Sequence, residues 1–274
     1  MPLGINSNIP AFRNANQLNQ TNNNLNRGFE RTSSGKRINS AADDAAGIAI
    51  ATRLTAQIFG SQTASRNALD AISLTQTAEG GLGGVTENLQ RIRELSLQAV
   101  NGSLSSSDRG ALQKEVNQLT QEITRTTETT TFNGVPVLDT DLNLEFQVGA
   151  NAGDTIAVSN NNIGQNLQNF GVNGIDISTV DGANAAIGVV DQALEAVNQT
   201  RSEFGAIQNR FESTIRTEET NRINTAASRS RIEDADFAKE IAEQTKNLIL
   251  QQAGIAVQAQ VNNLPKSILT LINN

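Results

Sequence analysis

The sequence predicts a mainly α protein: an elongated rod of long antiparallel helices in coiled-coil packing, with a small β-hairpin region at the middle of the chain. Three observations support this. Apolar residues recur at spacings of three, four and seven in both outer thirds of the 274 residues. Strict alternation of apolar and polar residues occurs only near the middle. Bulky side chains are scarce, since there is no Trp or Tyr and nine Phe, so narrow helix seams suit the chain better than a thick core.

The composition excludes several classes of function. The chain has no Cys and no His, and thiolate nucleophiles, imidazole bases and ordinary zinc sites need those residues. A net charge of −7 argues against nucleic-acid binding, which needs a clustered positive field. Residues 1–40 carry five Lys and Arg against one Glu, which we interpret as a solvated helix face. No apolar run reaches the ~18 residues of a membrane span. We therefore expect no enzyme activity, no cofactor, no metal, and neither nucleic acid nor membrane as a partner.

The first predicted helix carries one thin apolar stripe and ends at Ser33-Ser34-Gly35. Ser40 followed by Asp43 resembles a capping box that opens the next helix. Acidic residues at a helix start favour the positive end of the helix dipole, so we interpret Asp43-Asp44 as capping and not as a metal site. The N-terminus lacks the apolar core of a signal peptide, which argues against Sec-type export with cleavage.

The second predicted helix runs from about 43 to 100 and contains Gly80-Gly81-Leu82-Gly83-Gly84. The apolar spacing continues across these glycines, so we expect one continuous helix with a weak point. A third helix follows a loop at 101–107, and we expect its Thr-rich residues 124–131 to end it. Asn133-Gly134 then indicates a turn.

The middle of the chain predicts a hairpin. Leu142, Leu144, Phe146 and Val148 alternate with polar residues, as do Ile156 and Val158. Residues 149–154 supply the turn. Residues 159–182 are rich in Asn and Gly and carry no strong period, so we expect a short variable segment there.

The last third predicts two helices. We expect Asp181 to cap the first. In that helix Val190, Val197, Phe204 and Phe211 alternate with Ile187, Leu194 and Ile215 on two positions of a strict heptad, as in a coiled-coil seam. The second covers 235–272. The resulting domains are 1–40 with 235–274, a terminal helical coiled coil, and 41–234, a helical rod domain with the hairpin at about 142–158.

Long helices from the two ends of the chain can bury their stripes only against each other. The stripes of the terminal domain are too thin for a stable isolated pair, which predicts polymerisation. The residues expected to pack in the core of such a polymer are Ile5, Ile9, Leu18, Leu25, Phe29, Ile241, Leu248, Ile255, Leu264 and Ile268.

An ordered set of segments resembles bacterial flagellin. It spans about residues 5–158 and 183–272, and as a whole set it is very specific. The segments are SSGKRINSA at 33–41 with DDAAG at 43–47, ASRN at 64–67, QRIREL at 90–95, FNGV at 132–135, FQVGAN at 146–151, SRIEDAD at 230–236 and LQQAG at 250–254.

The resemblance implies a structural subunit that self-assembles into the flagellar filament for motility, secreted and extracellular. It implies terminal segments that are disordered in the monomer and form the inner tube of the filament. The implied partners are other subunits, an export chaperone with the flagellar type III export apparatus, and the hook–filament junction and cap proteins. The short middle indicates a near-minimal flagellin without large outer domains. A hook–filament junction protein remains the alternative. The peptidase of some flagellins would need a motif such as HExxH, which a chain without His cannot supply.

The resemblance also implies a surface formed by Arg91, Leu95 and Glu115, which in some flagellins is recognised by Toll-like receptor 5 and contributes to subunit packing. A simpler interpretation is that Arg91 and Glu94 form a helix-surface ion pair. The glycosylation patterns that begin at Asn19, Asn101 and Asn198 are expected by chance in a chain this rich in Asn, Ser and Thr.

Overall fold

A computed structural model describes residues 7–272 of the chain, with side chains to residue 265. Of the residues predicted from the sequence, Ile5 and the side chain of Ile268 lie outside this description. The chain forms two compact units: unit 1, Met1–Ala56 with Asn224–Asn274, and unit 2, Gln57–Ile223. Helices α2 (Ala45–Ala99) and α5 (Val180–Glu233) contribute residues to both.

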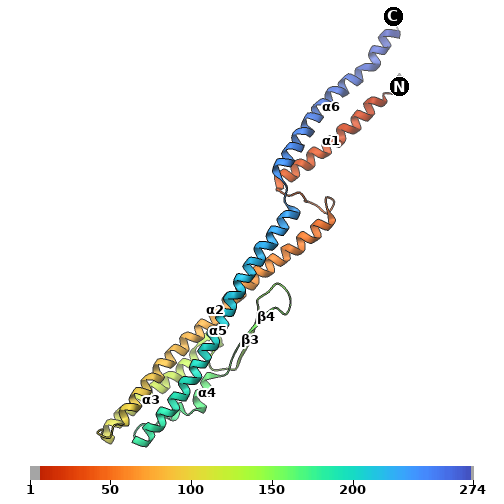
Figure 1. Cartoon of the computed structure of the whole chain (residues 1–274). Helices are drawn as coiled ribbons and strands as arrows, with labels where there is room; N and C mark the ends of the chain where they lie inside the picture. The colour runs from red at the N-terminus through yellow and green to blue at the C-terminus, as the bar shows by residue number, and fades with distance from the viewer. Residues whose placement is uncertain (1–6, 273–274) are drawn as a thin grey trace. The chain divides into compact units, whose positions relative to one another are not determined.

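Unit 1 contains the first and last helices, α1 (Ile9–Ser34) and α6 (Phe237–Ile272), which lie side by side (Figure 1). Asn8 caps α1 by accepting a hydrogen bond from the Ala11 N–H, and a proline in the first turn needs no intrahelical donor. Gly35 ends α1 with a φ of 71°, a left-handed conformation that glycine adopts without strain. The predicted helices at both ends of the chain are thus confirmed.

A short antiparallel contact, which we call the clamp, ties residues 35–37 to residues 232–235. Ala235 N–H donates to the Gly35 carbonyl at 2.9 Å, and Arg37 N–H donates to the Glu233 carbonyl at 2.7 Å. The Arg37 guanidinium donates to the Ile232 carbonyl at 2.6 Å. Backbone groups just outside helix ends need partners of this kind, and the clamp supplies them.

Helix α2 opens at a different residue from the predicted one. The Asp44 carboxylate accepts from the Gly47 N–H at 2.8 Å and so caps the helix. Asp43 instead folds back and accepts from the N–H groups of Asn39 and Ser40. Ser40 therefore lies in a turn held by Asp43, and the predicted capping box was wrong.

The continuous helix across Gly80–Gly84 is confirmed, because α2 runs unbroken from Ala45 to Ala99. Inside unit 2, its buried positions recur at alternating steps of three and four. One position of the predicted α5 seam is confirmed, because Val190, Val197, Phe204 and Phe211 are buried. The second buried position lies one residue before the predicted Ile187 and Leu194, which, like Ile215, are only half-buried. The buried residues at this second position are Ala186, Ala193, Thr200 and Ile207. These two heptad faces form most of the core of unit 2.

Helix α3 (Ser106–Thr129) begins with a capping box between Ser105 and Asp108. It ends at Thr129 with Thr130 as its C-cap, inside the predicted Thr-rich stretch 124–131. The hydroxyl of Thr124 donates to the Thr120 carbonyl at 3.1 Å, and that of Thr129 donates to the Arg125 carbonyl at 2.7 Å. These bonds to the preceding turn satisfy the hydroxyls within the helix, which is why the threonines do not break it.

Two small hairpins follow. Strands β1 (Thr131–Phe132) and β2 (Val135–Pro136) flank Asn133-Gly134, whose φ values of 50° and 80° suit a two-residue hairpin turn. The predicted longer hairpin is confirmed as β3 (Leu142–Gln147) paired antiparallel with β4 (Thr155–Asn160), with Leu144 opposite Val158.

The segment without a period holds α4 (Ile163–Asn169) and the 3-10 turn η1 (Val172–Gly174). Sequence analysis missed α4, whose buried residues Ile163 and Leu167 are too few to establish a helical period. Thr179, and not the predicted Asp181, caps α5, because its hydroxyl accepts from the Gly182 N–H at 3.0 Å.

Candidate subunit-packing surface

The seam between α1 and α6 is polar. The Asn14 side-chain amide donates to the Gly254 carbonyl and to the Gln258 side chain, both at 2.8 Å. Further along, the Gln251 amide donates to the Asn22 side chain at 2.7 Å. Side-chain amides thus occupy positions that leucines fill in a strong coiled coil.

Few apolar side chains enter this seam. Leu25 is buried, and Leu18 is half-buried. Leu18 faces Gly254, where an added Cβ would lie 3.3 Å from the Leu18 Cδ1. The glycine therefore lets the two helices approach closely at this point.

Most of the predicted packing residues do not lie in the seam. Ile241, Leu248 and Ile255 recur every seven residues along α6 and are 39–55% exposed. The other exposed members of the predicted set are Ile9, Phe29 and Leu264. The expectation that the terminal helices bury their stripes against each other therefore holds only for Leu18 and Leu25, because amide hydrogen bonds occupy the rest of the seam.

Sequence analysis missed part of this apolar surface. It followed one stripe along each helix, whereas adjacent positions of α6 also carry large aliphatic side chains. The additional exposed residues of α6 include Ile249, Leu250 and Val257. A hydrophobic run at 248–250 was the available signal, because three consecutive residues cannot share one face of a helix.

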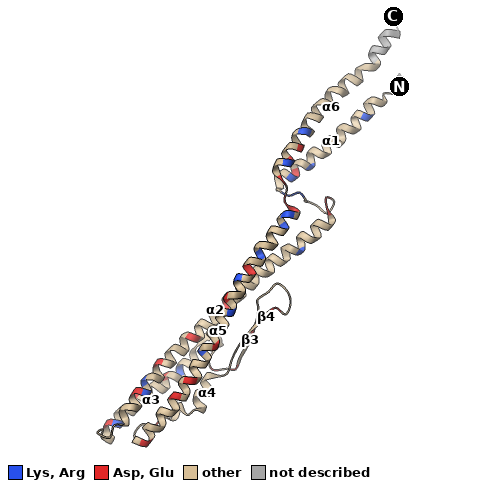
Figure 2. Cartoon of the chain, in the orientation of Figure 1, with Lys and Arg blue, Asp and Glu red and all other residues tan. Residues whose placement is uncertain are grey.

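The same surface carries no charge over much of its length. Residues 14–26 of α1 and 247–265 of α6 contain no Lys, Arg, Asp or Glu, and both stretches are tan in Figure 2. Apart from Arg13, the described charges of this helix pair lie nearer the clamp. A face that is apolar and amide-rich without charge can be buried without desolvating an ion.

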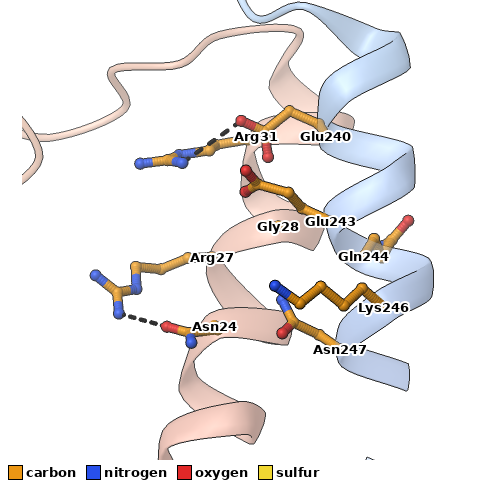
Figure 3. Close-up of a pocket in the computed structure, with 9 residues that line it drawn as sticks. All are labelled: Asn24, Arg27, Gly28, Arg31, Glu240, Glu243, Gln244, Lys246 and Asn247. Atoms are coloured by element: carbon orange, nitrogen blue, oxygen red, sulfur yellow. Dashed lines mark hydrogen bonds and ion pairs between the residues drawn. The ribbon is translucent and has the colours of Figure 1, made fainter. Parts of the chain in front are cut away.

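Near the clamp, α1 and α6 border a groove of about 370 Å³ (Figure 3). Arg31 spans the two helices and contacts Glu240 at 3.5 Å. The lining carries both signs of charge and is formed by Asn24, Arg27, Gly28, Arg31, Glu240, Glu243, Gln244, Lys246 and Asn247. A mixed lining of this kind does not select a single anionic or cationic ligand.

The predicted receptor surface lies in unit 2. The Arg91 guanidinium donates to Glu115 at 2.8 Å and to Glu94 at 2.6 Å, so it links α2 to α3. The hydrogen bond with Glu115, followed by that with Glu94, raises the pKa of Arg91 above its ordinary value. Leu95 is only 1% exposed. It packs in the core of unit 2, so the surface itself consists of Arg91 and Glu115.

Within the described part of the chain, neither a metal site nor a membrane span has the residues that it would need. Residues 7–265 contain no group of three or more acidic side chains placed to hold a metal ion. No described helix is both long and apolar enough to cross a membrane.

Comparisons with known proteins agree with this organisation. Residues 5–141 match the model of the bacterial flagellin N-terminal helical region, and residues 187–272 match that of the C-terminal helical region. A flagellin of Halalkalibacterium halodurans is 42% identical over 269 residues, covering 98% of this chain and 99% of the relative. A flagellin of Bacillus subtilis is 39% identical over 301 residues, covering 98% and 99%.

Solved structures show the same fold. The crystal structure of Bacillus cereus flagellin is 30% identical, with a TM-score of 0.51 over 56% of this chain and 88% of that one. A flagellar hook-associated protein from Vibrio parahaemolyticus reaches a TM-score of 0.60 over 70% of this chain, but at 14% identity it shows likeness of fold alone. With two family models and near-full-length relatives in agreement, the chain belongs to the bacterial flagellin family.

Proposed function

We propose that this flagellin, a structural subunit of the bacterial flagellar filament, polymerises through the apolar surface of its terminal domain, residues 1–40 and 235–274. In this proposal, the terminal domains of neighbouring copies form the core of the filament. The residues that pack there are Ile5, Ile9, Leu18, Leu25, Phe29, Ile241, Leu248, Ile255, Leu264 and Ile268. The single observation that carries the proposal is the exposed heptad of α6, Ile241, Leu248 and Ile255, in a single chain.

The physical driving force is burial of apolar area, which contributes about 25 cal/mol for each Å² removed from water. Large aliphatic side chains rarely lie together on the surface of a monomer, so a continuous exposed strip supports contact with another molecule. The stretches 14–26 of α1 and 247–265 of α6 carry no charge, which supports burial of more than one face of each helix. The partner that fits such a strip is a second copy that presents the same strip.

The test is substitution of one residue on the strip. Ile255→Asp would place a carboxylate in a dry interface at a cost of several kcal/mol. We expect this variant to remain soluble, to keep the helical circular dichroism of the parent, and to fail to elongate filament seeds. Ala242→Asp is the matched control, because Ala242 is exposed on another face of α6, outside the uncharged stretch and between the charged residues Lys239 and Glu243.

Light scattering after seeding, with negative-stain microscopy, measures the outcome. The control variant should elongate seeds at close to the parent rate. Normal filaments from Ile255→Asp would show that this face of α6 is not buried in the polymer. Equal loss in both variants would show that the whole helix surface is sensitive, and would also contradict the proposed face.

We also propose that the subunit leaves the cell through the flagellar type III apparatus without a cleaved signal peptide, with an export chaperone bound to its C-terminal segment. In the filament it would contact the hook–filament junction and cap proteins. The resemblance to flagellins supports these partners. Mass spectrometry of the N-terminus of secreted subunits tests the export route, since a cleaved signal would remove the first residues.

A further proposal is recognition of unit 2 by Toll-like receptor 5 through Arg91 and Glu115, with Leu95 supporting them from beneath. The Arg91–Glu115 contact supports it, because it holds both side chains in one place on adjacent helices. An Arg91→Ala variant should lose receptor signalling in a reporter assay, whereas Arg66→Ala, an exposed position elsewhere on α2, should keep it. Equal signalling by both variants would remove Arg91 from the recognition surface.

The alternative assignment is a hook–filament junction protein. The 159–182 segment and the rod domain 41–234 fit either assignment, and both kinds of protein share the fold. The number of copies per filament separates them, because a flagellin repeats along the whole filament and a junction protein occurs only at its base. Quantitative mass spectrometry of sheared filaments measures this ratio.

A further inference from the structure

The turn between α2 and α3 holds an asparagine with an unusual set of contacts. The Asn101 side-chain carbonyl accepts two hydrogen bonds from Ser103, one from the backbone N–H at 3.1 Å and one from the hydroxyl at 3.0 Å. Asn101, Gly102 and Ser103 are all exposed. Among the described residues, no acceptor contacts the Gly102 N–H. An electrophilic amide and a free backbone nitrogen are therefore adjacent in a water-exposed turn.

We propose that Asn101 is a site of spontaneous deamidation. The Gly102 backbone nitrogen attacks the side-chain carbonyl carbon of Asn101 and loses its proton, and the side-chain nitrogen leaves as ammonia. The product is a five-membered succinimide that joins residues 101 and 102. Water then opens either carbonyl of this ring and gives aspartate or isoaspartate. Water is the only co-reactant, and no oxidation or reduction takes place.

The contacts of Asn101 favour the first step. Negative charge develops on the side-chain oxygen as the ring closes, and hydrogen-bond donors already aimed at that oxygen stabilise it. Both Ser103 donors meet this requirement. Gly102 has no Cβ to crowd its nitrogen, and the space beside it is open, since an added Cβ would meet no atom within 4 Å.

The chain contains two internal comparisons. Asn173 also precedes a glycine, but the Gly174 N–H donates to the Gly171 carbonyl at 3.0 Å, which withholds the nucleophile. Asn133 precedes Gly134 in the tight β1–β2 turn, where its φ is 50° and no donor among residues 7–265 contacts its side-chain oxygen. Asn101 is the one of these three that combines a free nucleophile with a polarised amide.

The modification would change the charge at the start of α3. The Asn101 backbone carbonyl accepts from the Arg109 guanidinium at 3.4 Å, and Ser105 caps the helix four residues further on. A carboxylate at 101 would add a negative charge beside that positive helix end. Isoaspartate would also lengthen the backbone of the turn by one carbon.

The experiment incubates the full-length chain at neutral pH and follows each site by peptide mass spectrometry. Trypsin releases residues 94–109, in which Asn101 is the only asparagine. Cleavage after Glu separates Asn133 from Asn173. We expect conversion at Asn101 to be several-fold faster than at either other site. Equal rates at Asn101 and Asn173, or no conversion at Asn101 while either other site reacts, would overturn the proposal.

Two variants test the mechanism. Gly102→Ala crowds the nitrogen and Ser103→Ala removes the hydroxyl donor, so each should slow conversion at Asn101 several-fold. Gly110→Ala is the control, because the space beside Gly110 is equally open and its substitution leaves the turn untouched. An unchanged rate in both test variants would show that the turn geometry does not drive the reaction. In every variant, deamidation at Asn133 and Asn173 should proceed at the parent rate, because unfolding would change the rate at those sites as well.

Discussion

Asn14 and Gln258 lie 244 positions apart in the chain, and their side-chain amides are joined by a hydrogen bond of 2.8 Å. This bond lies in the seam of α1 and α6, where an ordinary coiled coil would place apolar side chains. A hydrogen bond of this kind contributes only about 0.5–1.5 kcal/mol net, because water offers the same groups equivalent partners. The seam thus orients the two helices without holding them strongly together, and the apolar side chains remain available to other copies.

An apolar seam should strengthen the terminal helix pair in the soluble subunit. Replacing both Asn14 and Gln258 with Leu adds buried apolar area worth about 1.5–3 kcal/mol for each side chain. We expect a larger helical signal in circular dichroism of the soluble chain. Asn16→Leu with Gln260→Leu is the control, because both positions are exposed. The same gain in the control pair would show that helix propensity, and not the seam, is responsible.

Removing residues 1–40 and 235–274 should leave a folded, soluble and monomeric protein. The core of unit 2 is built from α2, α3, α5 and the hairpins, all of which remain. The terminal helix pair is joined mainly by side-chain amide hydrogen bonds, which contribute little net stability to the monomer. The truncated chain should melt within a few degrees of the full-length monomer and should not elongate seeds. A large fall in melting temperature would mean that the terminal helices contribute substantially to the stability of the monomer, and polymerisation without them would place the filament contacts in unit 2.

The glycines of the Gly80–Gly84 stretch should respond differently to alanine. A Cβ at Gly81 would lie 2.7 Å from Thr130 Oγ1 and 2.9 Å from Leu138 Cδ1, whereas one at Gly80, Gly83 or Gly84 meets no atom within 4 Å. Alanine at an open helical position should stabilise by about 0.5–1 kcal/mol. At Gly81 overpacking should destabilise by about 1–3 kcal/mol. Thermal or urea unfolding measures both signs, and a stabilised Gly81→Ala variant would contradict the close approach.

The start of α3 should lose stability in acid. The hydrogen bond from the Ser105 hydroxyl, with that from the Ser105 backbone N–H, lowers the pKa of Asp108. A lowered pKa means that the carboxylate stabilises the fold above its unfolded-state pKa, and that this contribution is lost as pH falls through the folded-state pKa. Ser105→Ala should raise the pKa of Asp108 toward its ordinary value in an NMR titration. Ser107→Ala should leave this pKa unchanged. An unchanged pKa of Asp108 in Ser105→Ala would exclude the hydroxyl as the cause.

Helices with dense stripes were predictable from the sequence. In α2 and α5, small and aliphatic residues repeat at steps of three and four over many turns, so a few polar interruptions do not obscure the period. The glycines of α2 were read correctly for the same reason. The β3–β4 hairpin was equally clear, because alternation on both strands flanked one polar turn.

Helix ends were less predictable, because several residues near each end carry suitable side chains. Asp43 and Asp44 both can cap, and the backbone turn at Asn39 and Ser40 decides which one does. At the start of α5, Thr179 and Asp181 both carry side chains that can cap the helix, and Thr179 is the one that does so. The burial of Leu95 was missed because one helix segment, residues 90–95, supplies both a surface residue and a core residue one turn apart.

The polar seam of unit 1 was beyond prediction from one stripe. Asn and Gln give no hydrophobic period. The sequence therefore does not indicate that their side chains face the seam between α1 and α6. The apolar stripe was found, and its exposure outside the seam is consistent with the predicted packing against other copies.

The clamp has a mechanical consequence. Gly35 lies in the segment that follows α1, and Ala235 lies in the segment that precedes α6. The hydrogen bond between their backbone groups ties these two segments together. A tensile force on either segment is therefore shared by both segments before it reaches α1 or α6. In a filament, shear along one segment would have to break the backbone bonds of the clamp together before it could pull a terminal helix away.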